Sequence, residues 1–549
     1  MMNRREFLMG SLAINLAGLL PSASKVAAQS QPAGTQSPPN LVFILVDDMG
    51  FSDLGCFGGE IDTPHLDRLA SEGIRFTQMH NDAMCVASRS SLLSGKWWPR
   101  AGMGIKHGPT LPELLREQGY RNGIVGKWHL NGNPVDRGFD SFFGFLGGFA
   151  DHFSGHPSYR HNKEPFTDFG PDYFSTTAFT DHAVDFIRTK DADEKSKPFF
   201  LYLNYQAPHN PLQAPRDDIM KYRGRYLAGW QAIREARFER QKALGIVAPD
   251  AALPPYPLNL PGWESLSDAQ KNIEDLRMAV YAAMVEGIDQ GVGRVVEALE
   301  EEGIAEDTLI IFCSDNGTDS FHVMDQAMLE RALLPGDPDS NWQPGTGWAY
   351  ATVTPWRLYK ISKHSGGVVT GTVAWWTKGI TQPGRVDHSP LHFVDILPTW
   401  MHLIQEATGE AVDWQNQVEH AAGESFAPIF KNRHWQREQP MYFQFTDNRA
   451  VRNNQYTMVE VDDAGWELYR SDDYMEIHDL AEEMPEVVAE LEAQWLDWWR
   501  SESGENTYTP KSTADSPHYQ PQGDRGSGVM YHPTAMPASL AERYPLPES

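Results

Sequence analysis

Short apolar runs that alternate with longer amphipathic stretches constrain the fold of this chain more than any other feature. Residues 41–46 read Leu-Val-Phe-Ile-Leu-Val, an unbroken apolar run typical of a strand buried on both faces of a parallel sheet. Alternation of strands and helices predicts an α/β fold, with a mostly parallel central sheet covered by helices. Further strands are predicted at residues 121–125, 198–205 and 308–313, and helices from residue 63 and at 111–118, 176–189 and 273–302.

The hydrophobic pattern changes after a predicted large domain that spans residues 40–440. Short alternating runs follow, which favour an antiparallel sheet, and then an amphipathic helix at residues 485–499. We therefore expect a smaller C-terminal α+β subdomain over residues 441–510 and an extended tail over residues 511–549. The expected short strands are residues 441–446, 449–452, 456–461 and 466–469.

The first residues of the chain resemble an export signal. Arg4 and Arg5 precede an uncharged apolar stretch and a small-residue cleavage site, the pattern of a twin-arginine-type signal peptide. An uncleaved membrane anchor is the alternative, but the stretch is shorter than the roughly 20 residues that cross a bilayer. We expect a signal peptide at residues 1–28, a linker at residues 29–39, no membrane span, and a periplasmic or secreted protein.

The acidic balance of the chain excludes two classes of partner. The chain has 46 Lys and Arg against 74 Asp and Glu, a formal net charge of −28. A surface with this charge repels nucleic-acid phosphates and anionic lipid headgroups, so neither is expected as a partner. An anionic substrate would need a locally positive pocket. The 3 cysteines are an odd count for an exported protein, which excludes a framework of disulfides.

Polar side chains cluster where the predicted strands end. Asp47 and Asp48 follow the first strand, and Asp315 and Asn316 follow a later one. Because ligands of parallel sheets bind beyond the carboxyl ends of the strands, these residues are expected to meet. Oxygen-only ligands favour a hard cation over Zn²⁺, and Ca²⁺ is preferred here over Mg²⁺. The alternatives are a solvated turn for the Asp pair and a hairpin turn for Asp-Asn-Gly.

Cys85 stands at the start of a predicted short helix, and Arg89 lies one turn further along the same face. A helix N-terminus and a nearby guanidinium both stabilise a thiolate or a bound anion. The alternative is a buried structural cysteine followed by a surface arginine. The spacing alone does not separate these two interpretations.

The segment around Cys85, together with five others, resembles the signatures of the formylglycine-dependent (type I) sulfatase family, most like its bacterial arylsulfatases. The resemblance covers residues 40–440 in the family's order and implies an alkaline-phosphatase-like fold. Residues 448–452 and 466–469 resemble the family's C-terminal subdomain. The matching segments are Cys85-Val86-Ala87-Ser88-Arg89, Asp47-Asp48-Met49-Gly50, Gly126-Lys127-Trp128-His129, Ala207-Pro208-His209, Ser314-Asp315-Asn316-Gly317 and Lys360 ahead of Gly366-Gly367.

The resemblance implies hydrolysis of sulfate monoesters, with an aryl, alkyl or sugar leaving group. Cys85 would be oxidised to formylglycine by a maturation enzyme, and the formylglycine hydrate would attack sulfur. Asp47, Asp48, Asp315 and Asn316 would bind Ca²⁺, with Mg²⁺ as the other possibility.

The resemblance also assigns roles to the nearby cations and histidines. Arg89, Lys127 and Lys360 would hold the sulfate group together with the metal. His209, with Lys360, would protonate the leaving alcohol, and His129 would accept a proton as sulfate is released. The assigned substrate-binding residues include Lys127, His209 and Lys360.

The loops around the predicted site offer further candidates. Asp151 and His152, after the glycine-rich residues 144–148, are expected to line the substrate side. Two long insertions interrupt the pattern. Residues 216–267, a basic helical stretch that runs into a Pro-rich loop, are expected to be an excursion over the rim of the site, and residues 319–354 are expected to be a loop rich in Gly, Pro and Trp. Three tryptophans could form an aromatic wall for the leaving group, although Trp at loop ends more often anchors the loop. The tryptophans considered are Trp342, Trp348 and Trp356.

Two departures and two rival functions complete the sequence-based interpretation. Ala87 stands where the family's commonest pattern has Pro, and Ser365 stands where a glutamate often precedes the glycine pair.

The enzymatic rival is a phosphodiester or phosphonate monoester hydrolase of the same superfamily. The other rival, a binding protein that has lost catalysis, would be expected to lack some of the named residues, and none is missing.

Overall fold

The computed structural model describes residues 37–257, 260–321, 328, 330–460, 465–509 and 539–547. The predicted signal peptide and most of the predicted linker and tail lie outside these residues, so those assignments stay predictions. Within the described ranges, no helix has both the length and the apolar character needed to cross a bilayer.

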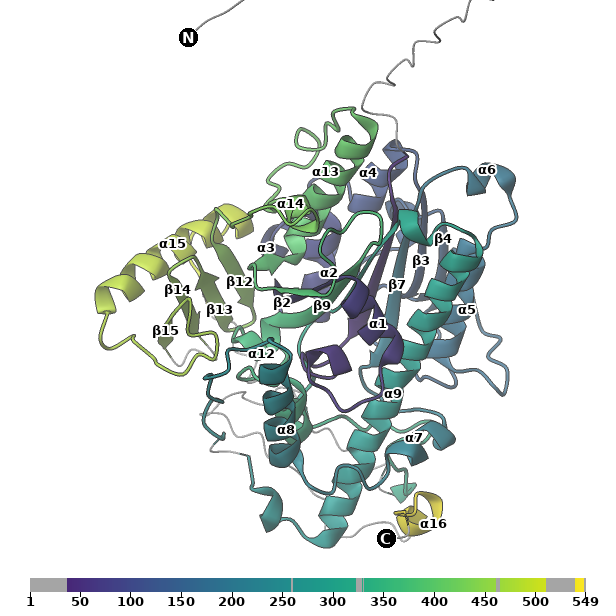
Figure 1. The fold of residues 1–549 in the computed structure, drawn as a ribbon, viewed down its shortest axis with the longest axis vertical. Helices are drawn as coiled ribbons and strands as arrows, with labels where there is room; N and C mark the ends of the chain where they lie inside the picture. The colour runs from purple at the N-terminus through teal and green to yellow at the C-terminus, as the bar shows by residue number, and fades with distance from the viewer. Residues whose placement is uncertain are drawn as a thin grey trace, which may run out of the picture.

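A large, mostly parallel sheet forms the centre of the molecule and confirms the predicted fold class (Figure 1). Its strands are β1 (Asn40–Asp47), β2 (Ile74–His80), β3 (Arg121–Lys127), β4 (Ser141–Phe145), β5 (Tyr159–His161), β6 (Glu164–Pro165), β7 (Phe199–Pro208), β8 (Thr308–Ser314), β9 (Val369–Trp375), β10 (Arg385–Asp387) and β11 (Leu391–His392). In the described part of the chain they are ordered β10-β2-β9-β8-β1-β7-β3-β4-β5-β6, with β11 paired to β2. β1 lies between β7 and β8 and is parallel to both.

Each face of β1 packs against a different set of helices, which explains its unbroken apolar sequence. Val42 and Ile44 belong to a core shared with α1, α5 and α9, whereas Leu41 and Phe43 belong to a second core shared with α2, α4 and α13. The long helix α9 runs beside α5 and α1 on its side of the sheet (Figure 1). These helices are α1 (Pro64–Glu72), α2 (Cys85–Ser94), α4 (Leu111–Glu117), α5 (Ser175–Ile187), α9 (Asp268–Glu301) and α13 (Ile396–Thr408).

Several elements differ from the sequence-based expectation. Helix α9 starts before residue 273, because Ser267 and Gln270 form a capping box that extends its first turn. Strands β2 and β9 were not predicted, and β9 is antiparallel to its neighbours β2 and β8. The insertion at residues 216–267 contains α7 (Arg216–Tyr222) and α8 (Trp230–Ala243), as expected of a helical stretch, whereas the insertion at residues 319–354, expected to be a loop, contains α11 (Thr346–Thr352).

A separate antiparallel sheet of four strands follows, at the left of Figure 1. Its strands are β12 (Met441–Phe445), β13 (Asn448–Arg452), β14 (Tyr456–Glu460) and β15 (Trp466–Arg470), covered by α15 (Pro485–Ser503). Trp495, Trp498 and Trp499 are buried on one side of α15. The predicted strands and helix of this region are therefore present in the predicted order.

A cluster of charged side chains ties this small sheet to the central one. The Glu467 carboxylate on β15 accepts a hydrogen bond from His364 Nε2 at 2.8 Å and lies 3.3 Å from an Arg357 guanidinium nitrogen. Burial alone would raise the pKa of Glu467, but the His364 hydrogen bond and the Arg357 charge hold it well below its usual range. The ionised carboxylate therefore contributes to the contact between the two sheets.

Replacing Glu467 tests this contact. A carboxyl group with a depressed folded-state pKa stabilises the fold above its unfolded-state pKa and loses that contribution as pH falls. We expect Glu467→Gln to lower the free energy of unfolding at pH 7 by about 2 kcal/mol, and the difference from wild type to shrink as pH falls from about 5 to 3. Urea unfolding of both proteins at several pH values measures this difference in the free energy of unfolding. Glu490→Gln, on the exposed face of α15, is the matched control and should change stability by less than about 0.5 kcal/mol. An equal Glu467→Gln effect at pH 7 and pH 3 would contradict the assignment.

Candidate active site

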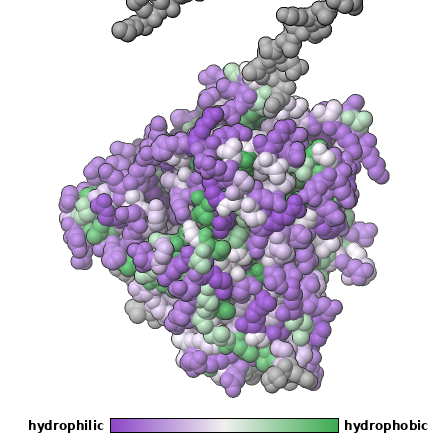
Figure 2. Space-filling model, in the orientation of Figure 1, coloured by the Kyte–Doolittle hydropathy of each residue, from purple (hydrophilic) through white to green (hydrophobic). Residues whose placement is uncertain are grey.

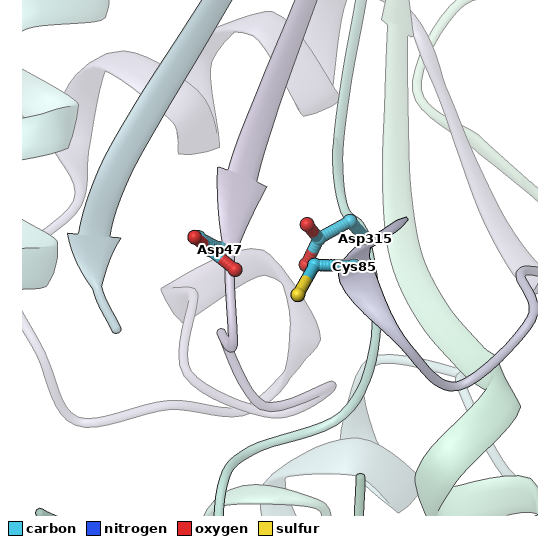
Figure 3. A group of neighbouring side chains, drawn as sticks. All are labelled: Asp47, Cys85 and Asp315. Atoms are coloured by element: carbon cyan, nitrogen blue, oxygen red, sulfur yellow. The ribbon is translucent and has the colours of Figure 1, made fainter. Parts of the chain in front are cut away.

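The register of two neighbouring parallel strands brings the predicted metal residues together. Val46 pairs with Ser314, so Asp47 at the end of β1 and Asp315 just beyond β8 emerge side by side. Figure 3 shows both carboxylates beside the Cys85 side chain. One oxygen from each carboxylate and the Cys85 sulfur all lie within 4.8 Å of one another. Residues far apart in sequence therefore meet at the carboxyl edge of the sheet, as predicted.

Asp48 turns the chain immediately after β1. It has a φ of 65°, the left-handed region that Asp adopts more readily than most residues. This turn directs its carboxylate toward Lys360, whose Nζ donates to it at 2.8 Å. The Asn316 amide also donates to Asp48, and His209 Nε2 lies 3.6 Å from the same carboxylate.

Helix α2 inserts Cys85 and Arg89 into this cluster from one face. Both side chains are buried, which rules out a surface position for Arg89. The Arg89 guanidinium donates to Asp315 at 2.8 and 3.1 Å. It also donates to the Lys127 carbonyl and to Asn204 Oδ1, each at 3.2 Å. Asn204, on β7, had not been identified from the sequence because a lone Asn inside a strand carries no motif.

The charges of the cluster shift the pKa values of its carboxyl groups in opposite directions. Burial would raise the pKa of Asp47, but Lys127, which donates to it, and the cations nearby hold it well below its usual range. Burial, followed by repulsion from Asp47, raises the pKa of Asp315 above its usual range. Carboxylates this close together are a natural site for a cation that would relieve the repulsion.

Two histidines lie at the ends of adjacent strands. His129 follows β3, and burial, then the charges of Lys127 and Arg89, lowers its pKa to about 2, so it is neutral at neutral pH. His209 follows β7, and its Nδ1 donates to the Asn210 carbonyl at 2.7 Å, which leaves Nε2 facing the cluster. Burial lowers the pKa of His209 as well.

A further buried acid, Asp319, had not been identified from the sequence. Burial raises its pKa to about 7, against the opposing charge of Lys360. It follows Thr318, whose carbonyl accepts a hydrogen bond from the Lys360 backbone at 3.2 Å. The sequence offered no signal for it, because it begins a long insertion without a regular pattern.

Ser365 is held by a carboxylate of the C-terminal subdomain, from the segment that follows β15. Its hydroxyl and its backbone N–H donate to the Glu476 carboxylate at 2.8 and 3.1 Å, and Arg452 donates to the same carboxylate at 2.9 Å. The position before the glycine pair, where the family often has a glutamate, is therefore a serine that is hydrogen-bonded to the carboxylate of Glu476.

Asp151 and His152 are engaged mainly by protein groups. The Asp151 carboxylate accepts from the Phe153 and Ser154 backbones and from the Gln213 amide, at 2.7–2.9 Å. His152 is buried, with Nδ1 2.6 Å from the Ser175 hydroxyl. These bonds fix the loop beside the site, and contact of either residue with substrate stays a prediction.

The three candidate tryptophans do not form an exposed wall. All are buried, and Trp342 Nε1 donates to the Leu333 carbonyl at 3.0 Å. Trp348 packs edge-on against Trp230 and Trp263, with ring centroids 5.8 and 5.9 Å away. Trp348 therefore anchors the two insertions to each other, and the buried positions of Trp342 and Trp356 agree with the anchoring role that the sequence had favoured.

The donor set of the cluster fits a hard divalent cation. Asp47 Oδ1 and Asn316 Oδ1 are buried and have no hydrogen-bond partner among the residues described. Buried oxygens without partners are uncommon in folded proteins, and a bound ion would account for these two. The nearby carboxylates of Asp48 and Asp315 complete a set of oxygen ligands of the kind that Ca²⁺ and Mg²⁺ prefer.

Comparison with known proteins agrees with this arrangement. A family model described as Sulfatase matches residues 39–406. An arylsulfatase of Klebsiella aerogenes is 32% identical over 427 residues, which cover 70% of this chain and 91% of the relative. The crystal structure of Ps i-CgsB in complex with k-i-k-neocarrahexaose covers 87% of this chain and 96% of its own, with a TM-score of 0.61 and 24% identity.

A second solved structure supports the same fold. It is BT4656 in complex with its substrate D-glucosamine-2-N,6-O-disulfate, which matches with a TM-score of 0.60 and 19% identity over 87% of this chain and 100% of its own. Such neighbours share the alkaline-phosphatase-like fold. Because the family model spans most of the chain and a curated relative matches along most of its own length, the chain belongs to the sulfatase family and is a sulfatase enzyme.

Proposed function

We propose that this protein hydrolyses sulfate monoesters through a formylglycine made from Cys85. The observation that carries the proposal is the placement of the Cys85 sulfur within 4.8 Å of oxygens of Asp47 and Asp315, at the N-terminus of a buried helix. Family membership and the similarity to an arylsulfatase support a sulfate ester as substrate. Formylglycine at this position would supply a geminal-diol hydroxyl as the nucleophile.

The Asp47, Asp48, Asp315 and Asn316 oxygens would hold the metal, with Ca²⁺ preferred over Mg²⁺. A divalent cation there supplies positive charge for the nonbridging oxygens of the sulfate group. Lys127 and Lys360 lie beside the same carboxylates and would share in holding the sulfate.

Arg89 is assigned a supporting role in addition to its charge. Its guanidinium donors are directed at Asp315, Asn204 and the Lys127 backbone. It therefore fixes the orientation of Asp315 and connects three elements of the site. Its positive charge still contributes to the field that the sulfate group meets.

The two histidines would divide the proton transfers. His209 Nε2 faces the cluster, and in the imidazolium form, which the Asp48 carboxylate 3.6 Å away favours, it would give its Nε2 proton to the leaving oxygen while Nδ1 stays bonded to the Asn210 carbonyl. His129 is neutral at neutral pH, because its pKa is lowered to about 2, and it would accept a proton when sulfate is released. Lys360 lies beside Asp48 and could assist His209 at the leaving group.

Burial of the nucleophile has a consequence for maturation. Cys85 and Ala87 are both buried in the folded chain. A formylglycine-generating enzyme must reach the thiol, so oxidation would have to precede closure of the fold around α2. Because Ala replaces the commoner Pro at residue 87, the maturation enzyme would have to accept this variant segment.

Substrate preference is the direct test of the proposal. The measurement is kcat/KM for p-nitrophenyl sulfate beside the matching phosphate monoester and diester, on protein whose residue 85 has been checked for the aldehyde by peptide mass. A clear preference for the sulfate ester is expected. Preference for the diester would assign the protein to the phosphodiesterase or phosphonate hydrolase branch instead.

Removing the Cys85 thiol should abolish turnover and leave the fold intact. We expect Cys85→Ala to lower kcat by at least about 10⁴-fold, because loss of a covalent nucleophile removes the main route of catalysis. Cys56→Ala, which removes a thiol outside the cluster, is the control and should keep full activity. Retained turnover in Cys85→Ala would remove the nucleophile assignment.

Metal binding should raise the free energy of unfolding. With Ca²⁺ at a hundredfold excess over its Kd, the folded state should gain about 2.7 kcal/mol relative to protein in EDTA. Thermal unfolding and calorimetric titration measure the gain without any substrate. Asp315→Asn should lose most of it, whereas Asp151→Asn should keep it, because the Asp151 carboxylate is bonded to protein donors. Equal gains in both variants would place the cation elsewhere.

A further inference from the structure

Phe149 is unusual among the large apolar side chains of the described residues. It is 52% exposed, the most of the six that are exposed, the others being Met103, Leu227, Leu244, Tyr474 and Leu546. The face of the molecule seen in Figure 2 is mostly hydrophilic, with only small apolar areas. A single exposed apolar ring is common on protein surfaces, so the position of Phe149 beside the site is the informative observation.

The ring lies beside the predicted proton donor. Phe149 and His209 are nearly parallel, with an interplanar angle of 18° and ring centroids 6.4 Å apart. His209 Nε2 in turn lies 3.6 Å from the Asp48 carboxylate. The exposed ring thus stands at the side of the site where the leaving oxygen would be protonated.

The backbone around Phe149 is held in place. The adjacent Ala150 donates its N–H to Gln206 Oε1 at 2.9 Å, and its carbonyl accepts from Gln206 Nε2 at 2.6 Å. Gln206 belongs to β7, the strand that ends just before His209. The same strand end therefore positions both rings.

The preceding glycine lets the segment approach the other histidine. A Cβ on Gly148 would lie 3.0 Å from His129 Nε2, closer than most side-chain contacts. Consecutive residues thus contact the two histidines that the proposed mechanism uses, Gly148 beside His129 and Phe149 beside His209. A segment built this way forms part of the wall around the reacting group.

We infer that Phe149 is the stacking surface for the leaving group and selects esters whose leaving group is a ring with an apolar face. An aromatic ring binds aryl groups by offset stacking, and it binds the C–H face of a pyranose by apolar contact. A linear alkyl chain lacks such a face and gains less. This inference rests on the proposed function and adds to it the residue that discriminates among leaving groups.

The test compares three sulfate esters in the matured enzyme. They are p-nitrophenyl sulfate, a monosaccharide 6-sulfate and linear hexyl sulfate. For Phe149→Ala we expect the KM of p-nitrophenyl sulfate to rise about tenfold with kcat changed less than about twofold, and hexyl sulfate to change less than about twofold in either constant. A matching KM increase for the sugar ester would extend the preference to pyranoses, and its absence would restrict it to aryl groups.

Three controls separate stacking from a structural effect. Phe149→Trp should keep the wild-type KM for the aryl ester, and Phe149→Leu should fall between wild type and Ala. Tyr474→Ala removes an aromatic ring of similar exposure, 49%, in the turn that follows β15, and should leave all constants unchanged. The thermal midpoint of each variant shows that the fold is intact.

Two results would overturn the inference in different ways. If Phe149→Ala lowered kcat/KM equally for all three esters, Phe149 would not select the leaving group, although the enzyme would still be a sulfatase. If matured wild-type protein hydrolysed none of the three esters, the proposed function would fail and the inference with it.

Discussion

The balance of buried charge at the carboxyl edge of the sheet is the constraint on which the site depends. Three buried carboxylates, Asp47, Asp48 and Asp315, meet three buried cations, Lys127, Lys360 and Arg89. An unpaired buried charge costs several kcal/mol, so none of these groups could be there without its partners. The formal charges of these six groups sum to zero, and Asp319, the further buried acid beside Lys360, adds negative charge where it is ionised. A divalent cation bound there, as proposed, would add two positive charges, which would help a molecule with a net charge of −28 to bind an anionic ester.

The fold supplies this balance through backbone register more than through local sequence. β1 and β8 are parallel neighbours, so their last residues lie next to each other whatever their side chains. Helix α2 then fits between strand ends, and its Arg89 bonds to groups from β3, β7 and the β8 end at once. Loss of one partner would leave the others uncompensated, which makes the site a cooperative unit and not a set of independent ligands.

The sequence predicted the parts of the site that carry local signals. Local sequence patterns indicate where three of its segments lie in the fold: the apolar run before Asp47, the Cys85 segment and the strand ahead of Asp315. The structure brings Asp47, Cys85 and Asp315 together. Asn204, Asp319 and Phe149 had no such signal, because their importance arises from neighbours distant in sequence. Strand β9 was not predicted for the same reason. Its antiparallel direction depends on how the chain connects it to distant strands, which no local pattern shows. The tryptophans of the insertions are buried because they pack on one another, a property that no single segment shows.

In the proposed mechanism, the two ends of the reaction are built by different parts of the molecule. The sulfate end is made of buried strand termini joined by ion pairs, in which a changed residue alters the charge balance. The leaving-group end is made of the segment after β4, where Phe149 takes part in no ion pair and is held through the backbone of Ala150. Substitutions there can change which alcohol leaves without disturbing the groups that hold sulfate. A fold organised this way can retain one chemistry over a range of esters, because selectivity and charge balance are physically separate.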